Sequence, residues 1–534
     1  MPRHRRARTT VTVVAAAGVL ATAFSGQAAG APAVIGISLV PIGTYATGIF
    51  DGSAAEIVAH DAASQRLFVV NANAGVVDVL DIADPADPTL INTIVASGEV
   101  NSLAVREGIV AVAVQSDPVQ DPGSVELFDT DGNALAAVQV GALPDMLTFT
   151  PDGTTIVVAN EGEPAGYCEG DAGDPEGSVS IIDISAGAGG VTQDDVRTAD
   201  FRAFNGRAGA LRAAGVRIFG PGASVAQDLE PEYVAISDDG ATAWVGLQEN
   251  NAFAVVDLQS ATVTEILPLG YKSHLASRQG LDASDDDGKI NIRTWPVRGM
   301  YMPDGLDAYE RDGETFIVTA NEGDARDYEC FSEEARIGDL RLSPAAFPAA
   351  RLLQQDNRLG RLKTTTAFPT ADPATALYSY GARSFSIRDA DGNLVFDSGD
   401  DFERITAAVD PVNFNSNNDE NDSFDSRSDD KGPEPEGIEI GRAFGSTFAF
   451  IGLERVGGIM VYNIDSPEDA HFVSYVNNRD FEGDAEAGTA GDLGPEGIAF
   501  IPRADSPIGV PLLAVANEVS GTTTVYKVLP VLGR

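Results

Sequence analysis

Basic residues, histidine and cysteine are all scarce in this chain. Its 534 residues include 35 Lys and Arg, 4 His and 2 Cys against 80 Asp and Glu, and the formal net charge is −45. Nucleic acids and anionic membranes bind to basic faces, so neither is an expected partner. Two cysteines and a few scattered histidines do not make a structural zinc site. The charge favours a cationic partner, and the simplest cation is a metal ion.

Several catalytic motifs are also absent. The sequence has no Gly-x-Ser-x-Gly elbow, no P-loop and no His-Glu-x-x-His pair. Serine-hydrolase, nucleotide-hydrolase and zinc-protease activities therefore have no support. Beyond the N-terminal region no apolar run is long enough to cross a bilayer, so no integral membrane span is expected.

Residues 1–31 have the pattern of a secretory signal peptide. Four arginines lie among the first eight residues, an apolar stretch runs from Val11 to Phe24, and small residues follow. This stretch is short for a membrane anchor, which is the alternative. Residues 529–534 contain no recognisable sorting or lipidation signal. We therefore expect a secreted, extracellular protein.

A repeated pattern indicates the fold. Each copy has a proline followed by an acid, an apolar strand, a turn, a second apolar strand and an Asn-Glu step, and two further strands follow it. The clear copies cover 143–161, 230–249, 303–322, 435–454 and 495–518, and two weaker ones start at Glu56 and Asn101. Seven units of four antiparallel strands predict an all-β fold, a seven-bladed β-propeller over residues 36–530. The alternative is two separate β-domains.

The ends of the repeat region indicate how the ring closes. The last copy ends after its third strand, so the segment Gly36–Gly43 is expected to supply the fourth. Long insertions interrupt the repeats, and we expect them on the top face of the ring. They cover roughly 186–228, 270–302, 325–375 and 403–433.

The repeat also predicts a ring of carboxylates. The two polar positions of each copy are separated by one hairpin, so both are expected on the same face, at the mouth of a central channel. The first positions are Glu56, Asn101, Asp145, Glu232, Asp304, Glu436 and Glu496, and the second are Asn73, Gln115, Glu161, Glu249, Glu322, Glu454 and Glu518. Crowded carboxylates repel one another unless a cation compensates them.

Oxygen ligands without histidine or cysteine suit a hard ion, so we expect Ca²⁺ at this mouth. The alternative is that each acid caps its own loop. The predicted ligands are Asp145, Glu161, Glu232, Glu249, Asp304, Glu322, Glu436, Glu454, Glu496 and Glu518.

Two other acidic segments have weaker calcium patterns. In 282–291, Asp285, Asp287 and Gly288 match the first half of a calcium loop, but Ala283 occupies the first ligand position. The segment 413–430 is so polar that a solvated loop is expected, unless a cation orders it.

A few basic residues lie near these acids and are candidates for binding phosphate. Arginine presents a planar fork that suits phosphate or carboxylate, and the alternative is simple pairing with a neighbouring acid. The candidates are Arg326, Arg383, Arg427, Lys431 and Arg455. No nucleophile stands out, so the catalytic residues stay unnamed.

The two cysteines, Cys168 and Cys330, each follow an Asn-Glu step by seven or eight residues. In an oxidising compartment an even pair suggests a disulfide, here between two top-face loops. Two free thiols are the alternative.

Five stretches together resemble a known family. They are residues 295–304, 319–328, 383–387 with 396–399, 427–437 and 452–462. They resemble the choice-of-anchor I family of secreted bacterial β-propellers, which is similar to mesenchyme-specific cell-surface glycoproteins. Many relatives end in a sorting or anchoring segment, whereas residues 529–534 contain no such signal, so surface attachment is not expected.

Relatives in this family are often labelled alkaline phosphatases, so the resemblance implies a candidate metal-dependent phosphomonoesterase. The alternative is a non-catalytic extracellular propeller that binds protein, glycan or mineral. Bound calcium would be part of either function.

Overall fold

The computed structural model describes residues 14–15, 34–171 and 173–533. The expected signal peptide lies outside the described residues except for Val14–Ala15 (β1), which pairs with β33 (His471–Val476). In the described part of the chain, no helix is both long and apolar enough to cross a membrane.

Antiparallel strands are the main regular secondary structure of the described chain, and most of them form four-stranded sheets. The first sheet is β3 (Val58–Asp61), β4 (Arg66–Asn71), β5 (Val76–Asp81) and β6 (Thr89–Val95). The second is β7 (Val100–Arg106), β8 (Ile109–Val114), β9 (Pro122–Asp129) and β10 (Ala134–Ala142). The third is β11 (Pro144–Phe149), β12 (Thr155–Asn160), β13 (Ser178–Asp183) and β14 (Val196–Asp200). The fourth is β15 (Val234–Ile236), β16 (Thr242–Leu247), β17 (Ala252–Asp257) and β18 (Thr262–Pro268).

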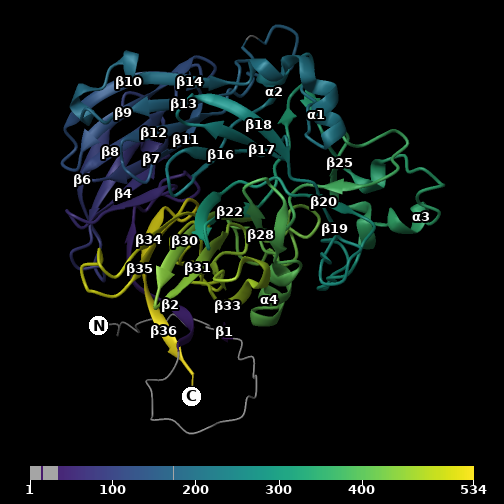
Figure 1. The fold of residues 1–534 in the computed structure, drawn as a ribbon. Coiled ribbons are helices and arrows are strands. Elements are labelled where there is room, and N and C mark those ends of the chain that lie inside the picture. The colour runs from purple at the N-terminus through teal and green to yellow at the C-terminus, as the bar shows by residue number, and fades with distance from the viewer. Residues whose placement is uncertain (1–13, 16–33, 172, 534) are drawn as a thin grey trace.

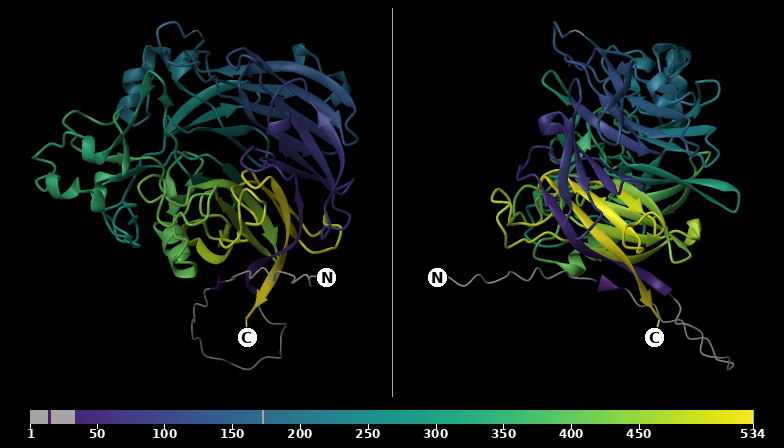
Figure 2. Two further views of the ribbon diagram at one scale, coloured as in Figure 1. Left: turned by 180° about the vertical axis from the view of Figure 1, so that it is seen from behind. Right: turned by 90° about the vertical axis from the view of Figure 1, so that its left-hand side faces the viewer.

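The remaining sheets follow the same plan. The fifth is β21 (Leu306–Arg311), β22 (Glu314–Asn321), β28 (Ser384–Asp389) and β29 (Leu394–Asp397). The sixth is β30 (Pro435–Ala443), β31 (Ser446–Leu453), β32 (Ile459–Asn463) and β33, with β1 at its edge. The seventh is β34 (Pro495–Ile501), β35 (Leu512–Asn517), β36 (Thr522–Leu532) and β2 (Val34–Ala46). Because β2 pairs with β36 along its whole length, the N-terminal strand completes the last sheet (Figures 1 and 2).

The sheets form a closed ring. The first strand of each sheet contacts the first strand of the next, and β34 contacts β3. A separate hydrophobic core fills each interface between neighbouring sheets. Between the last sheet and the first, for example, Leu512 and Ala514 belong to the same core as Val69 and Leu80. Both faces of most sheets are therefore buried, as in a β-propeller.

Insertions project from one side of the ring (Figure 1). They contain α1 (Ala208–Ala214) and α2 (Val225–Asp228), then β19 (Tyr271–Ser273) and β20 (Arg298–Met300). Between β22 and β28 lie β23 (Asp327–Tyr328), β24 (Phe331–Ser332), β25 (Glu334–Arg336), α3 (Ala350–Leu353), β26 (Lys363–Thr365) and β27 (Tyr378–Ser379). The last insertion begins with α4 (Asp401–Val409).

Two expectations about these insertions are wrong. The first insertion does not start at 186, because β14 is the fourth strand of its sheet; its Val-Arg-Thr-Ala-Asp sequence is an exposed edge strand with little apolar signal. The segment 413–430 is not a solvated loop, since Asn415, Asp425 and Ser428 are each at most 1% exposed. Asn415 donates hydrogen bonds to Glu403 and Ser428, and Ser428 donates one to Asp425.

Candidate metal centre at the mouth of the ring

One hairpin in each clear copy positions two carboxylates at the same end of its sheet. In the third sheet Pro144 pairs with Asn160, and the register shifts before Leu147. Asp145 lies in that irregular step, and Glu161 follows the paired asparagine directly. An extra residue at the start of a strand re-aims its side chain. The same pairing and register shift recur in the sixth and seventh sheets.

The first acids of neighbouring sheets are close because glycines let the backbones meet. A Cβ on Gly437 would lie against the carbonyl oxygen of Glu496, and one on Gly497 against that of Glu56. The amide of Gly497 also donates a 3.0 Å hydrogen bond to the Glu56 carbonyl. Where the sequence is Pro-acid-Gly, the glycine thus lets the first strand of one sheet contact the first strand of the next at the residues that carry the acids.

The first acids repel one another. Burial raises the pKa of Glu232, and Asp304 is the strongest of the charges that raise it further. Burial likewise raises the pKa of Glu436 well above its ordinary value, with added repulsion from Glu454 and Glu496. Burial raises the pKa values of Glu56 and Asp145 to about 7. Without a cation, these groups hold their negative charges at a cost in free energy.

Three of these acids each have a buried oxygen atom without a hydrogen-bond partner. These atoms are the Oε2 atoms of Glu232, Glu436 and Glu496. Buried polar atoms normally have a partner, and a carboxylate oxygen can accept one from a cation. Loop capping does not account for these three atoms.

A pocket of about 450 Å³ opens at this mouth. Its lining is almost wholly polar and includes Glu232, Asp304, Glu322, Glu436, Glu454 and Glu518, together with Asp51, Asp324, Lys431 and Arg455. Around it lie three sets of carboxylates, each with one oxygen per residue within 4.8 Å of the others. The sets are Glu56, Glu496 and Glu518; Glu161, Glu230 and Glu249; and Glu322, Glu434 and Glu454. Six of the ten predicted ligands line the pocket, and Glu161, Glu249 and Glu496 belong to the three sets. Asp145 belongs to neither group, but its charge raises the pKa of Glu161.

The carboxylates are distributed unevenly around the ring. In the first two sheets three of the four expected positions are Asn73, Asn101 and Gln115. Asn101 uses its side chain to donate a 3.0 Å hydrogen bond to the Pro144 carbonyl, which is a structural role. The negative charge is therefore concentrated on the side formed by the third to seventh sheets.

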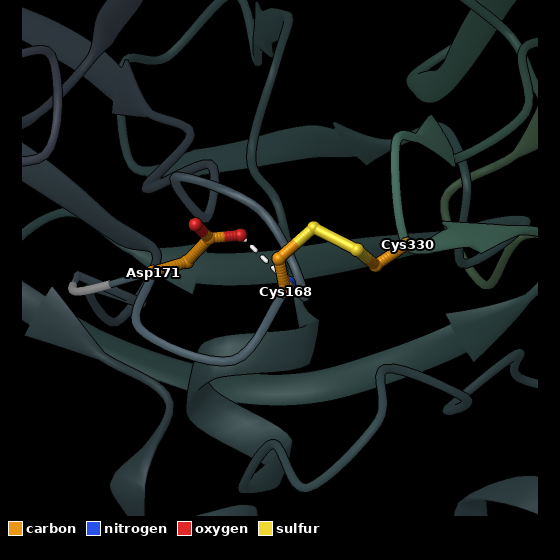
Figure 3. Close-up of a disulfide and its surroundings, with 3 residues drawn as sticks. All are labelled: Cys168, Asp171 and Cys330. Atoms are coloured by element: carbon orange, nitrogen blue, oxygen red, sulfur yellow. Dashed lines mark hydrogen bonds between the residues drawn. A yellow bond between two sulfur atoms is a disulfide. The ribbon is translucent and has the colours of Figure 1, made fainter.

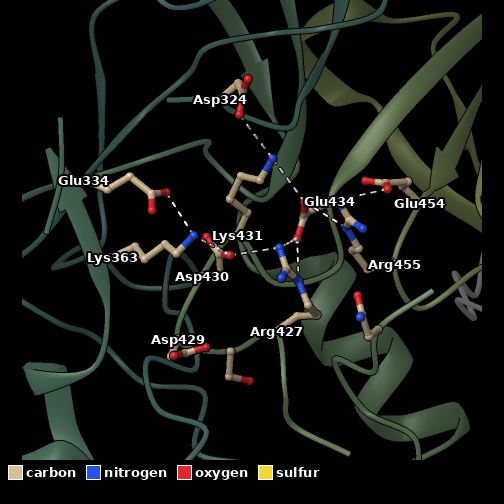
Figure 4. Close-up of polar contacts among 12 residues, drawn as sticks. Asp324, Glu334, Lys363, Arg427, Asp429, Asp430, Lys431, Glu434, Glu454 and Arg455 are labelled. Carbon is tan, nitrogen blue, oxygen red and sulfur yellow. Dashed lines mark hydrogen bonds and ion pairs between the residues drawn. The ribbon is translucent and has the colours of Figure 1, made fainter. Parts of the chain in front are cut away.

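Three of the candidate phosphate-binding residues converge on a single buried carboxylate, Glu434 (Figure 4). Arg427 reaches Glu434 at 2.5 Å, and Lys431 and Arg455 reach it at 3.1 Å each. Burial opposes ionisation of Glu434, but these three cations hold its pKa at about 2. Lys431 also contacts Glu322, and Arg455 contacts Glu454 at 3.1 Å.

The other two candidates do not line the mouth pocket. Arg326 is 3% exposed and pairs with Asp228 and Glu230 beneath the first insertion. Arg383 is 4% exposed and bonds to Glu403 and to backbone carbonyls of the insertions. Both side chains are fully engaged with carboxylates and carbonyls, which is the pairing that the sequence offered as the alternative.

Sequence reasoning missed Glu230, Glu434 and Asp324. Glu230 and Glu434 precede the prolines of two Glu-Pro-Glu triplets, and each pairs with arginine. The additional glutamate before the proline in each Glu-Pro-Glu triplet was the feature of the sequence that could have indicated these two residues. Asp324, three residues after Asn321, lines the mouth pocket and lies 4.0 Å from Lys431.

A disulfide joins Cys168, in the loop after β12, to Cys330, between β23 and β24 (Figure 3). The Cα atoms are 5.1 Å apart. Close by, the Tyr328 hydroxyl donates a 2.5 Å hydrogen bond to Glu163, and its ring contacts that of Tyr167 edge-on. The bond ties the third sheet to the largest insertion beside the mouth.

Residues 56–467 match the family described as the Choice-of-anchor I domain. Over 193 residues the chain is 32% identical to Gigasin-3a of Magallana gigas, covering 33% of this chain and 66% of that protein. Over 279 residues it is 27% identical to the Mesenchyme-specific cell surface glycoprotein of Strongylocentrotus purpuratus, covering 44% of this chain and 35% of that protein. The chain thus spans just under two thirds of the first relative and about a third of the second.

Solved structures with a similar chain course have low sequence identity. Hydrazine synthase of Kuenenia stuttgartiensis has a TM-score of 0.45 and 14% identity over 90% of this chain and 99% of that one. The Cps50 (Swd1) β-propeller domain of Myceliophteria thermophila has a TM-score of 0.43 and 9% identity over 91% of this chain and 99% of that one.

Proposed function

The chain belongs to the choice-of-anchor I family, and from this membership we propose that it is a secreted seven-bladed β-propeller that binds Ca²⁺ at its acidic mouth. Each of the seven sheets corresponds to one blade. The bound ions hold the mouth together and present a surface to an extracellular ligand. A relative named as a cell surface glycoprotein supports an extracellular role.

The observation that supports calcium most is the set of unpartnered buried oxygens on Glu232, Glu436 and Glu496. These carboxylates lie on separate blades, and each is repelled by neighbouring acids, Glu232 by Asp304 and Glu436 by Glu454 and Glu496. Cations bound at the mouth would offset this repulsion. A site built from carboxylates and amides, with no histidine or thiol among the pocket residues, suits a hard cation.

Calcium titration of the purified chain tests this proposal. In chelator the melting temperature is expected to be low, and added Ca²⁺ is expected to raise it. Glu436→Gln is expected to weaken the calcium response about tenfold or more, because the ion loses a charged ligand. Glu310→Gln removes the same charge from an exposed position on β21 and is the matched control. The proposal is contradicted if added Ca²⁺ leaves the melting temperature unchanged and no Ca²⁺ is bound at equilibrium.

A second candidate function is metal-dependent phosphomonoester hydrolysis. A smaller pocket of about 260 Å³ adjoins the mouth, and Asp324, Lys431 and Arg455 line both. Lys363 and Arg427 also line the smaller pocket, so four cationic side chains surround it. Such cations stabilise negative charge on a phosphoryl group, and an adjacent Ca²⁺ would polarise it.

Each of these four cationic side chains already pairs with a carboxylate, so its charge is compensated before any phosphate binds. This compensation favours the binding function over hydrolysis. Turnover of a chromogenic phosphomonoester at alkaline pH, with Ca²⁺ or with chelator, separates the two functions. Calcium-dependent turnover that is lost in Lys431→Gln supports hydrolysis. Calcium binding without turnover leaves an extracellular binding propeller for protein, glycan or mineral.

A further inference from the structure

A second group of buried acids lies outside the ring, between two insertions. Asp282 lies in the loop between β19 and β20, and Asp425 belongs to the segment after α4. Asp282 is 0% exposed and Asp425 is 1% exposed. They are 143 residues apart in sequence, yet a continuous set of hydrogen bonds connects them.

Glu403, Asn415 and Ser428 form that connection. The backbone amide of Asp282 donates to Glu403 Oε2 at 3.0 Å, and Asn415 Nδ2 donates to Glu403 Oε1 at 3.1 Å. Asn415 Nδ2 also donates to Ser428 Oγ at 2.9 Å, and Ser428 Oγ donates to Asp425 Oδ1 at 2.6 Å. The backbone amide of Asn291 donates to Asp282 Oδ2, so the side chains of Asp282, Asn415 and Asp425 are each bonded through one polar atom and have one oxygen left over.

Three oxygen atoms are left over in this group. Asp282 Oδ1, Asp425 Oδ2 and Asn415 Oδ1 are buried and have no hydrogen-bond partner. All three residues are at least nine-tenths buried, so water does not readily satisfy these atoms. Two carboxylates and an amide are oxygen ligands of the kind that calcium takes.

The charges around these atoms are not balanced. Arg383 pairs with Glu403, and Lys289 pairs with Asp287, which repels Asp425. Within the described residues Asp282 and Asp425 form no ion pair with a cationic side chain. A divalent cation would supply the missing positive charge.

The half calcium loop in the sequence does not explain this cluster. Asp285, which matches a ligand position of that loop, pairs with Arg361 at 2.5 Å instead. Asp287 bonds to Lys289 and Asn291 within its own turn. The ligand candidates come from two separate insertions, a combination that no linear motif describes.

We propose that Asp282, Asn415 and Asp425 bind a divalent cation, of the Ca²⁺ type, that joins the two insertions outside the ring. This site is independent of the acidic mouth. Its ion holds the segment 413–430 against the loop after β19, and it thereby positions Arg427 and Lys431, which follow Asp425 closely and contact Glu434.

Counting bound Ca²⁺ by equilibrium dialysis tests the site. Asp425→Asn is expected to bind one ion fewer than the wild type, or to bind that ion about tenfold more weakly. Asp422→Asn makes the same charge change at an exposed position three residues away and is expected to bind as the wild type does. Glu436→Gln at the mouth is expected to keep the ion held by Asp425, so the failure of either site is recognised separately.

Hydrogen exchange of the unmodified chain tests the site without relying on a variant that folds. Adding Ca²⁺ to chelator-treated protein is expected to slow exchange in 282–291 and 413–430. The same protection is expected in Glu436→Gln. Unchanged exchange in both segments, or an ion count in folded Asp425→Asn equal to that of the wild type, overturns the proposal.

Discussion

Replacing Glu434 tests how the mouth compensates its charges. Its side chain is 0% exposed and contacts Arg427, Lys431 and Arg455 at 3.1 Å or less. Glu434→Gln keeps the shape but removes the charge that all three cations share. Removing one partner of a buried ion pair is strongly destabilising, typically by about 3–5 kcal/mol.

The pKa of Glu434 gives an independent magnitude. Burial alone would raise it, but the three cations hold it at about 2 against an ordinary value of 4.5. At ~1.4 kcal/mol for each tenfold change in proton affinity, this difference corresponds to about 3 kcal/mol of stability. Both arguments therefore predict that Glu434→Gln loses about 3 kcal/mol of unfolding free energy near pH 7.

The pH dependence of this loss has a defined sign. Because the folded-state pKa is depressed, the stabilisation by Glu434 is fully present above about pH 4.5 and disappears as the pH falls towards about 2. The difference between wild type and Glu434→Gln should shrink across this window.

Urea unfolding in chelator, followed by tryptophan fluorescence at several pH values, measures the difference. Glu310→Gln, at an exposed position, is the control and should change stability by less than ~0.5 kcal/mol. A loss below about 1 kcal/mol at pH 7, or a loss that stays constant down to pH 2, would refute the reasoning.

Three further predictions concern the ring and its insertions. In chelator, the melting temperature should rise as the pH falls from about 8 to about 5. Glu56 and Asp145 have pKa values raised to about 7, so their protonation in this range relieves the repulsion between the acids. Added Ca²⁺ should make the melting temperature depend less on pH. Gly437→Ala should destabilise the fold by more than about 2 kcal/mol in urea unfolding, since its Cβ would collide with the carbonyl of Glu496, and a neutral result would mean that the strand starts are not in contact. Reducing the disulfide should cost about 2–5 kcal/mol, because the bond closes a loop with a sequence separation of 162, and an unchanged urea midpoint in reductant would contradict it.

Local pattern was sufficient for the ring and its acids. Strand alternation, the Pro-acid step and the Asn-Glu step are properties of neighbouring residues. The repeat, and the positions of Asp145 and Glu161 at the same end of one hairpin, could therefore be predicted from the sequence. The completion of the last sheet by the N-terminal strand followed from counting strands. These features depend on the alternation of apolar residues along the strands and on the residues in the turns, and both can be identified directly in the sequence.

Only the tertiary structure decided which charges are compensated. Arg326 meets Glu230 across 96 residues, and Lys431 meets Glu322 across 109. The paths of the insertions determine these contacts. The hydrophobic core of the insertions is formed by residues between 281 and 377 and does not follow the strand repeat of the ring. For the same reason the sequence indicated the segments 282–291 and 413–430 separately but could not show that Asp282 and Asp425 belong to one group. A strand repeat is a local property of the chain, whereas the balance of buried charge depends on contacts between distant loops.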